Sequence, residues 1–152
     1  MYVLPVAEGT STAGGERADL AALVARLSRL LIAAEQPILA AHSISMWGYI
    51  VLTVLRAEPM RTQAALARTI GADKTRIIDV LDELQARGLI EREPDPADRR
   101  VRLLRLTPAG RRLHTLVRSA IRQEEHRLLS RLSVSDRRGF LNALQVLDPG
   151  CP

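Results

Sequence analysis

The chain has 152 residues, a length that suits one domain with a sizeable hydrophobic core. Apolar residues make up 47% of it and aromatic residues only 3%, so we expect packed helices rich in Leu, Ile, Val and Ala. The formal net charge is +5, which favours a polyanionic partner because each neutralised phosphate releases condensed counterions. A soluble basic protein with an arginine-rich codon bias has the same overall charge, so the placement of the charges must decide.

Several classes of site and location are not expected. Cys151 is the single cysteine, which rules out a disulfide within one chain, and we interpret it as an incidental thiol. The spacing of His42, His114 and His126 forms no metal signature, and we expect His114 and His126 to be solvated on one long helix. The sequence predicts no catalytic residues, no cofactor and no membrane partner. Because neither a secretory signal nor an apolar run of about 20 residues is present, we expect a cytoplasmic protein.

The first third of the chain predicts an arm and two helices. Residues 1–15 are small and polar, and we expect a flexible arm. Residues 16–58 are expected to form N-terminal helices for dimerisation and support. Apolar residues recur at three- and four-residue steps over 20–34, and Pro37 is expected to kink or end that first helix. Ser45 is a candidate N-cap for the second.

A DNA-binding unit is expected over residues 59–107. Thr62 can cap a short helix that stops at Gly71, and Asp73 can cap another that stops at Gly88. Two short helices joined by a tight turn containing glycine are a helix-turn-helix.

A basic hairpin follows the two short helices. Residues 89–93 and 101–106 can pair as strands, and two prolines in the tip at 94–97 are expected to bar strand structure there. The stretch 99–112 holds six Arg and no acid. Two helices followed by a basic ribbon are the order of a winged helix, in which a helix fills the major groove of duplex DNA and the ribbon reaches the minor groove.

The last third of the chain predicts two more helices. Thr107 followed by Pro108 indicates an N-cap and a proline at the first helical position. Ser133 with Asp136 resembles a capping box that opens the last helix. We assign residues 108–148 to C-terminal dimerisation helices and 149–152 to a tail.

The predicted fold is mostly α with a small β-hairpin wing: a winged helix-turn-helix plus N- and C-terminal dimerisation helices. The first helix and the last two are amphipathic, and together they are too many for a compact winged helix to bury. Packing against a second copy gives a two-fold dimer with two recognition helices. A larger monomeric bundle is the alternative, and we favour the dimer because a lone winged helix reads only a short half-site.

The wing and the helices before it match a known pattern. A spaced motif of Asp, Arg, two Leu, Thr and Gly is met by Asp98, Arg100, Leu104, Leu106, Thr107 and Gly110. With the helical stretches 63–67 and 81–90, the segment 60–110 resembles the MarR (multiple antibiotic resistance regulator) family. The resemblance implies a triangular homodimer, a repressor of a near-palindromic operator in double-stranded DNA, and release by a small amphipathic or phenolic molecule.

The predicted recognition helix begins with polar residues that we expect to face DNA: Lys74, Thr75 and Arg76. Arg76 can donate two hydrogen bonds to guanine, and a phosphate clamp or a solvated side chain is the alternative. Asp79, one turn later, can orient Arg76 or accept from a cytosine amino group. The family usually has a small hydroxyl residue in place of Arg76 and a polar or basic one in place of Asp79, so operator preferences do not carry over.

The wing is expected to contribute further contacts. Arg100 is the predicted minor-groove residue, braced by Asp98, because a narrow groove attracts guanidinium through its negative potential. Arg99 and Arg102 are expected to contact phosphate. Further phosphate contacts are expected at the start of the first short helix, from Arg61, Thr62 and Gln63.

The effector site rests on the family resemblance, which implies a crevice near the second helix. His42, Met46, Trp47 and Tyr49 bring aromatic and thioether groups together there, suited to a flat acid or phenol. Each of the four also has an ordinary interpretation as a core or turn residue. We therefore predict a DNA-binding repressor, and the alternative is a winged-helix protein-interaction module without DNA binding, favoured by Asp79 and the acids near it.

Overall fold

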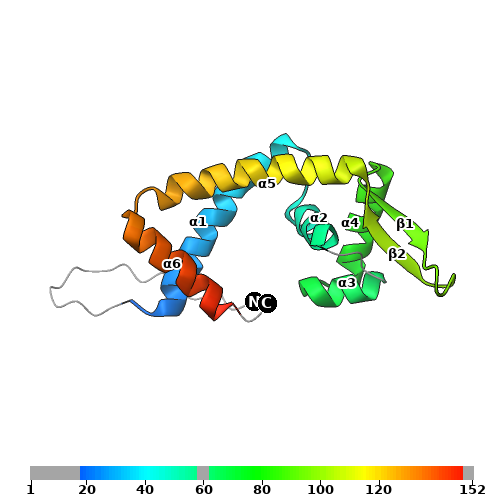
Figure 1. Ribbon diagram of the computed structural model, residues 1–152, viewed down its shortest axis with the longest axis horizontal. Helices are drawn as coiled ribbons and strands as arrows, with labels where there is room; N and C mark the ends of the chain where they lie inside the picture. Colours follow the sequence, from blue (N-terminus) through cyan, green and yellow to red (C-terminus); the bar gives the residue numbers. More distant parts are fainter. Residues whose placement is uncertain (1–17, 58–61, 149–152) are drawn as a thin grey trace.

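The computed structural model describes residues 18–57 and 62–148, which form two lobes joined by one long helix (Figure 1). The elements are α1 (Leu20–Ala41), α2 (Met46–Ala57), α3 (Gln63–Ile70), α4 (Lys74–Ala86), β1 (Ile90–Pro94), β2 (Arg102–Leu106), α5 (Pro108–Leu129) and α6 (Val134–Leu147). Helices α2, α3 and α4 and the β1–β2 hairpin form one lobe, and α1 and α6 form the other. The predicted fold class, mostly α with a small β-hairpin, is confirmed. The predicted arm 1–15 and tail 149–152 lie outside the described residues.

Local capping chemistry sets where the helices begin. Each predicted N-cap accepts a hydrogen bond from a backbone N–H two or three residues further on; these caps are Ser45, Thr62, Asp73, Thr107 and Ser133. The Ser133 hydroxyl also donates to the Asp136 carboxylate at 2.7 Å. The capping positions predicted from the sequence are therefore confirmed.

Two proline expectations need correction. Pro37 does not end the first helix, since it lies inside α1, which continues to Ala41 and buries Leu39; a kink at Pro37, the other alternative, stays a prediction. Pro94 is the last residue of β1, paired opposite Arg102, and does not belong to the loop. The sheet has two strands, so both are edges, and an edge position tolerates a residue without an N–H donor.

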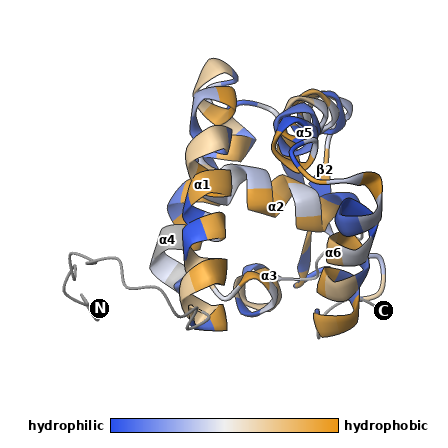
Figure 2. Cartoon of the chain, turned by 90° about the vertical axis from the view of Figure 1, so that its left-hand side faces the viewer, coloured by the Kyte–Doolittle hydropathy of each residue, from blue (hydrophilic) through white to orange (hydrophobic). Residues whose placement is uncertain are grey.

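The hydrophobic core lies in the lobe that holds the hairpin. Side chains from α2, α3, α4, β2 and α5 meet in it, and Leu52, Leu66, Leu81, Leu104 and Val117 are at most 1% exposed. In contrast, α6 buries none of its residues. Hydrophobic residues recur along α1 and α6 (Figure 2), and the large exposed ones are Leu20, Leu23, Val24, Leu30, Ile32, Val134, Leu141, Leu144, Val146 and Leu147. No single helix in the described ranges is long and apolar enough to cross a membrane, although α1 and α2, bent by 87°, pass that test as a pair.

One tight joint connects the segment that follows α4, the hairpin and α5. The Thr107 N–H donates to the Leu89 carbonyl oxygen at 3.1 Å, and the Thr107 hydroxyl donates to the Gly88 carbonyl oxygen at 2.7 Å. The same hydroxyl accepts from the Gly110 N–H at 3.0 Å. Gly110 packs so closely on the Leu89 carbonyl that a Cβ atom there would overlap with it.

Gly110→Ala should therefore destabilise the protein by about 1–3 kcal/mol, because the backbone of the joint must move to admit the methyl group. Gly139→Ala is the matched control, since Gly139 is exposed on α6 and a Cβ there meets nothing within 4 Å. Alanine at that position should be neutral or stabilise by up to about 1 kcal/mol. Urea unfolding of both variants checks this, and equal stability of the two would contradict the assigned role of Gly110.

Candidate nucleic-acid interface

The tip of the hairpin is held by two aspartates. The Asp95 N–H donates to the Val101 carbonyl at 2.8 Å, and the Asp95 carboxylate accepts from the Ala97 N–H at 2.9 Å. Asp98 accepts from the Arg100 N–H at 3.0 Å, which confirms that it braces the loop. Asp95 is only 6% exposed, and sequence reasoning missed it. An aspartate that bonds the N–H two residues on is an Asx turn, and Asp95-Pro96-Ala97 carried that signal.

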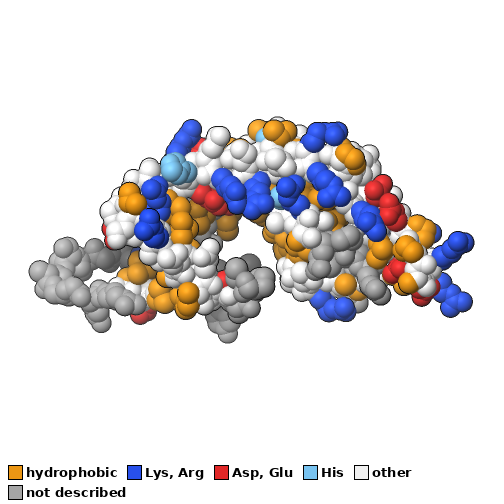
Figure 3. Space-filling view, in the orientation of Figure 1, with side chains coloured by type: hydrophobic (Ala, Val, Ile, Leu, Met, Phe, Trp, Pro, Cys, Tyr) orange, Lys and Arg blue, Asp and Glu red, His pale blue; other side chains and the backbone are white. Residues whose placement is uncertain are grey.

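The braced tip presents unpaired positive charge. Arg99, Arg100 and Arg102 are exposed, and none of them takes part in the ion pairs found among the described residues. Lys and Arg side chains project beyond the outer end of the hairpin (Figure 3). Arg105, by contrast, is paired with Glu93 across the two strands at 2.7 Å. The wing therefore offers cations that no acid of the described chain compensates.

The start of α3 lies beside the wing. A cavity of about 330 Å³ between them is lined by Thr62, Gln63, Arg100 and Arg102, four of the residues predicted from the sequence, together with Arg92. The N-terminus of α3 also presents backbone N–H groups, which favour phosphate. The structure thus brings the α3 and wing candidates together, whereas Arg61 lies outside the described residues.

The first two turns of α4 carry the other candidate residues. Thr75 and Asp79 are exposed, and the backbone places Lys74 and Arg76 in the turn that follows the Asp73 cap. Asp79 lies about one turn after Arg76. These assignments to DNA contact remain predictions.

A polar brace ties the wing to α4. Arg92 of β1 donates to the Asp82 carboxylate at 2.7 Å and also to the Gln85 side-chain oxygen. The pairing links β1 to the later turns of α4 and so restrains the hairpin relative to that helix. This pairing could not be predicted from the sequence, because it depends on how the hairpin packs against the helix.

The expectation that His114 is solvated is wrong. His114 is fully buried between α5 and α2, where its ring stacks on Tyr49 with centroids 5.4 Å apart and 14° between the planes. Its Nε2 lies 3.1 Å from the Thr53 hydroxyl. Burial lowers the pKa of His114, and the nearby Arg56 and Arg118 lower it further. The apolar residues that share its face of α5, such as Val117, explain why the imidazole faces inward.

The four candidate effector residues lie at or near the start of α2. The His42 carbonyl accepts from the Arg87 guanidinium at 3.3 Å, and Met46, Trp47 and Tyr49 are half-buried. Met46 and Tyr49 pack against the core. None of the four lines the cavities described here within residues 18–57 and 62–148, so their role as an effector site remains a prediction.

The sequence of this chain is similar to those of known proteins. Residues 45–101 match the family model described as MarR family. The chain is 31% identical over 99 residues to a putative transcriptional regulatory protein for the hcr operon of Thauera aromatica, and 29% identical over 99 residues to the transcriptional repressor NicR of Pseudomonas putida. Each match covers 65% of this chain, but only 60% and 63% of the respective relative.

Solved structures extend the likeness to nearly the whole fold. A mutant MarR from Escherichia coli superposes with a TM-score of 0.78 at 22% identity, covering 88% of this chain and 98% of that one. CouR bound to a 23-mer DNA duplex has a TM-score of 0.72 at 28% identity, covering 84% and 91% of the two chains. Fold and site define a winged helix-turn-helix protein with additional helices at both ends. The family model, the regulatory relatives and the solved structures together support a regulator of the MarR family.

The buried His114 predicts a pH dependence of stability. A histidine whose folded pKa is lowered binds its proton more readily in the unfolded chain, so the free energy of unfolding falls as pH drops through the unfolded pKa of about 6.5. The slope attributable to this residue is at most about 1.4 kcal/mol per pH unit. Urea unfolding between pH 7.5 and 5.5 should show a shallower slope for His114→Gln than for the wild type. His126→Gln, which changes an exposed imidazole, is the control; an unchanged slope in His114→Gln contradicts the assignment.

Proposed function

We propose that this chain is a cytoplasmic, homodimeric regulator of transcription that binds DNA in a sequence-specific manner and acts as a repressor. The observation that carries the proposal is the set of uncompensated wing arginines, Arg99, Arg100 and Arg102, beside the N-terminus of α3. Cations held on a braced projection suit the phosphate backbone and the minor groove. The relatives in Thauera and Pseudomonas are named as regulatory proteins, and one structural neighbour, CouR, is bound to duplex DNA, which supports a regulator over an enzyme.

In the proposed complex, α4 enters the major groove and the wing follows the adjacent minor groove. Thr75 and Arg76 contact base edges or phosphates at the start of α4, while Asp79 orients Arg76 or accepts from cytosine. Arg100 enters the minor groove, and Arg99 and Arg102 contact phosphates. Lys74, Arg61, Thr62 and Gln63 supply further backbone contacts.

The uncovered apolar faces support the dimer. Residues 16–58 and 108–148 would supply the dimer contacts, and residues 59–107 would bind DNA. The exposed Leu and Val side chains of α1 and α6 have no cover within the described chain, and burying such surface stabilises association. A two-fold dimer presents two copies of α4 and therefore suits a near-palindromic operator.

A small amphipathic or phenolic ligand would release the DNA, bound near His42, Met46, Trp47 and Tyr49. The structural neighbour CouR from Rhodococcus jostii was solved with p-coumaroyl-CoA, an aromatic thioester, which supports a ligand with an aromatic part. The rival function is a winged-helix module that docks on protein without binding DNA. The exposed acids on α4, Asp79, Asp82 and Glu83, favour it.

Arginine substitutions separate these functions. Arg100→Ala should weaken binding to the protein's own upstream promoter DNA and reduce the salt slope of log K by about one unit, because one phosphate-proximal cation is lost. Arg76→Ala should reduce discrimination between sequences by about 1–3 kcal/mol if it reads a base. Fluorescence anisotropy over a salt series measures both. Arg131→Ala, which removes an exposed charge from the turn after α5, is the control. If Arg100→Ala and Arg76→Ala both bind as the wild type does, the DNA-binding proposal fails.

The dimer has its own test. Leu144→Glu places a charge on the exposed apolar face of α6 and should convert the dimer to a monomer at micromolar concentration. Asn142→Glu adds the same charge two residues from Leu144, on the other side of α6, and should leave the dimer intact. Sedimentation measures the mass, and a folded wild-type monomer of 16.8 kDa would overturn the assembly.

A further inference from the structure

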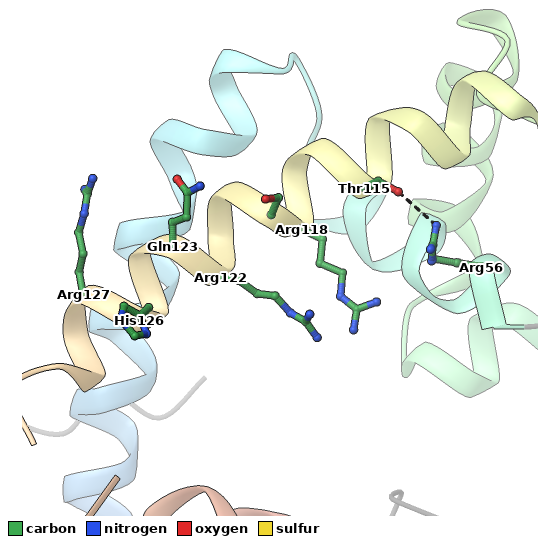
Figure 4. A pocket seen from close by; sticks show the side chains of 8 residues that line it. Arg56, Thr115, Arg118, Arg122, Gln123, His126 and Arg127 are labelled. Atoms are coloured by element: carbon green, nitrogen blue, oxygen red, sulfur yellow. Dashed lines mark hydrogen bonds between the residues drawn. The ribbon is translucent and has the colours of Figure 1, made fainter. Parts of the chain in front are cut away.

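A second basic surface lies away from the wing, on the long connecting helix. A groove of about 630 Å³ runs along α5 from Thr115 to Arg127 and is closed at one end by Arg56 of α2. Arg118 and Arg122 extend from α5 into the same space, and Arg56 approaches it from α2 (Figure 4). Lys and Arg side chains form a row on this side of α5 (Figure 3). We call this surface the α5 groove.

The charge of the α5 groove is uncompensated. No acidic residue lines it, and Arg56, Arg118 and Arg122 take part in none of the ion pairs found in the described ranges. Arg127 differs, since it pairs with Glu124 and points away from the other three. Like charges one helical turn apart disfavour the folded helix, and none of the ion pairs in the described ranges offsets that repulsion between Arg118 and Arg122. An anion would.

The geometry and the lining chemistry favour phosphate. Arg118 and Arg122 are separated by about 6 Å along the helix axis, from four residues at 1.5 Å each. Two guanidinium forks at that separation can each bind one of two neighbouring phosphate groups bidentately. The groove also holds neutral donors, Thr115, Ser119 and Gln123, which suit phosphate oxygens. A groove of this volume admits a small molecule.

We infer that the α5 groove binds a small molecule carrying two adjacent phosphate groups, through Arg56, Arg118 and Arg122, and that this ligand regulates DNA binding. The regulatory part rests on the proposed function; the binding part does not. The ligand would be either an additional effector or the phosphorylated portion of the one that releases DNA.

The position of Arg56 explains how such a ligand would act. Arg56 lies in the last turn of α2 and donates to the Thr115 hydroxyl of α5 at 3.3 Å, so it spans the two helices. Helix α2 packs against α3, α4 and β2, and α3, α4 and the hairpin carry the candidate DNA contacts. Helix α5 packs against α1 in the other lobe. A diphosphate held jointly by Arg56 and the α5 arginines adds bonds across this α2–α5 junction. It would therefore favour one orientation of the DNA-binding lobe over others.

Two other occupants have the same charge requirement, and both are less favoured. In the proposed complex, duplex DNA contacts the wing and α3, which lie at one end of the molecule. The α5 groove follows the middle of α5 instead (Figure 1). The exposed faces of α1 and α6 that a second copy would cover are apolar, not acidic. The experiment treats both as alternative outcomes.

Isothermal titration calorimetry on the full chain tests binding, with inorganic pyrophosphate, ADP and coenzyme A as probes and sulfate as the single-anion control. The three probes share a diphosphate and differ in what it carries, so their order of affinity identifies the source. Arg118→Gln/Arg122→Gln should weaken pyrophosphate binding about tenfold or more, because two charged hydrogen-bonding groups are lost. Arg118→Lys/Arg122→Lys keeps the charge without the fork and should bind with intermediate affinity. Arg131→Gln, outside the groove, should match the wild type.

The outcomes are distinct. Weakening confined to the groove variants supports the site, and an accompanying shift of promoter affinity on adding the tightest probe supports regulation. Equal affinity for sulfate and pyrophosphate, or equal binding by the Gln variant and the wild type, overturns the site. So does a loss of promoter binding by the Gln variant without any added anion, which would mark a DNA surface, or a change in its sedimentation, which would mark a subunit contact. Pyrophosphate binding in a chain that binds no promoter would overturn the proposed function and leave the site standing.

Discussion

The arrangement of the molecule depends on the joint where Thr107 meets Gly88 and Leu89. There one hydroxyl caps α5 and bonds to the loop that leaves α4, while the Thr107 N–H closes the base of the hairpin. Helix α4, the hairpin and α5 are therefore joined by hydrogen bonds at this one place. Gly110 permits this closeness, because any side chain there would collide with the Leu89 carbonyl.

From that joint, α5 presents different chemistry on its different faces. One face buries His114 and Val117 against α2, and another carries Arg118 and Arg122 along an open groove. The two faces interact, because Arg118 is among the charges that hold the pKa of His114 down. The helix is thus the element through which charge and packing in the connecting region can influence the DNA-binding lobe. The Arg92 brace then carries any movement of α4 to the wing.

What the sequence predicted and what it missed follow from the range of the interactions. N-caps such as Thr62 and Asp73 depend on a few neighbouring residues, so their signals are local and were correct. The burial of His114 depends on which face of α5 meets α2, and an imidazole is common both in solvent and in a core, so its residue type alone did not decide between them. Of the two alternatives for Pro37, an end of the helix is excluded because α1 continues and buries Leu39, a long-range contact that local sequence does not show.

Some residues of the candidate site were likewise predictable from the local sequence, and others were not. The wing arginines were predictable from an acid-free run of charges next to prolines. The Arg92–Asp82 pair and the α5 groove join residues from separate elements, and only the packed chain brings them together. The groove is the clearest case, since Arg56 and Arg118 are far apart in the sequence.

In the complex that we propose, each protomer of a dimer sets its braced wing into the minor groove beside its own α4. Ala97 is exposed at the wing tip, and Cys151 is the single native cysteine, so Ala97→Cys in a Cys151→Ser background can carry one iron chelate at a defined place. Mapping the strand breaks it makes in promoter DNA measures where the wing lies. The account predicts two clusters of minor-groove cleavage placed symmetrically about the operator centre. Uniform cleavage along the DNA, or none, would contradict it.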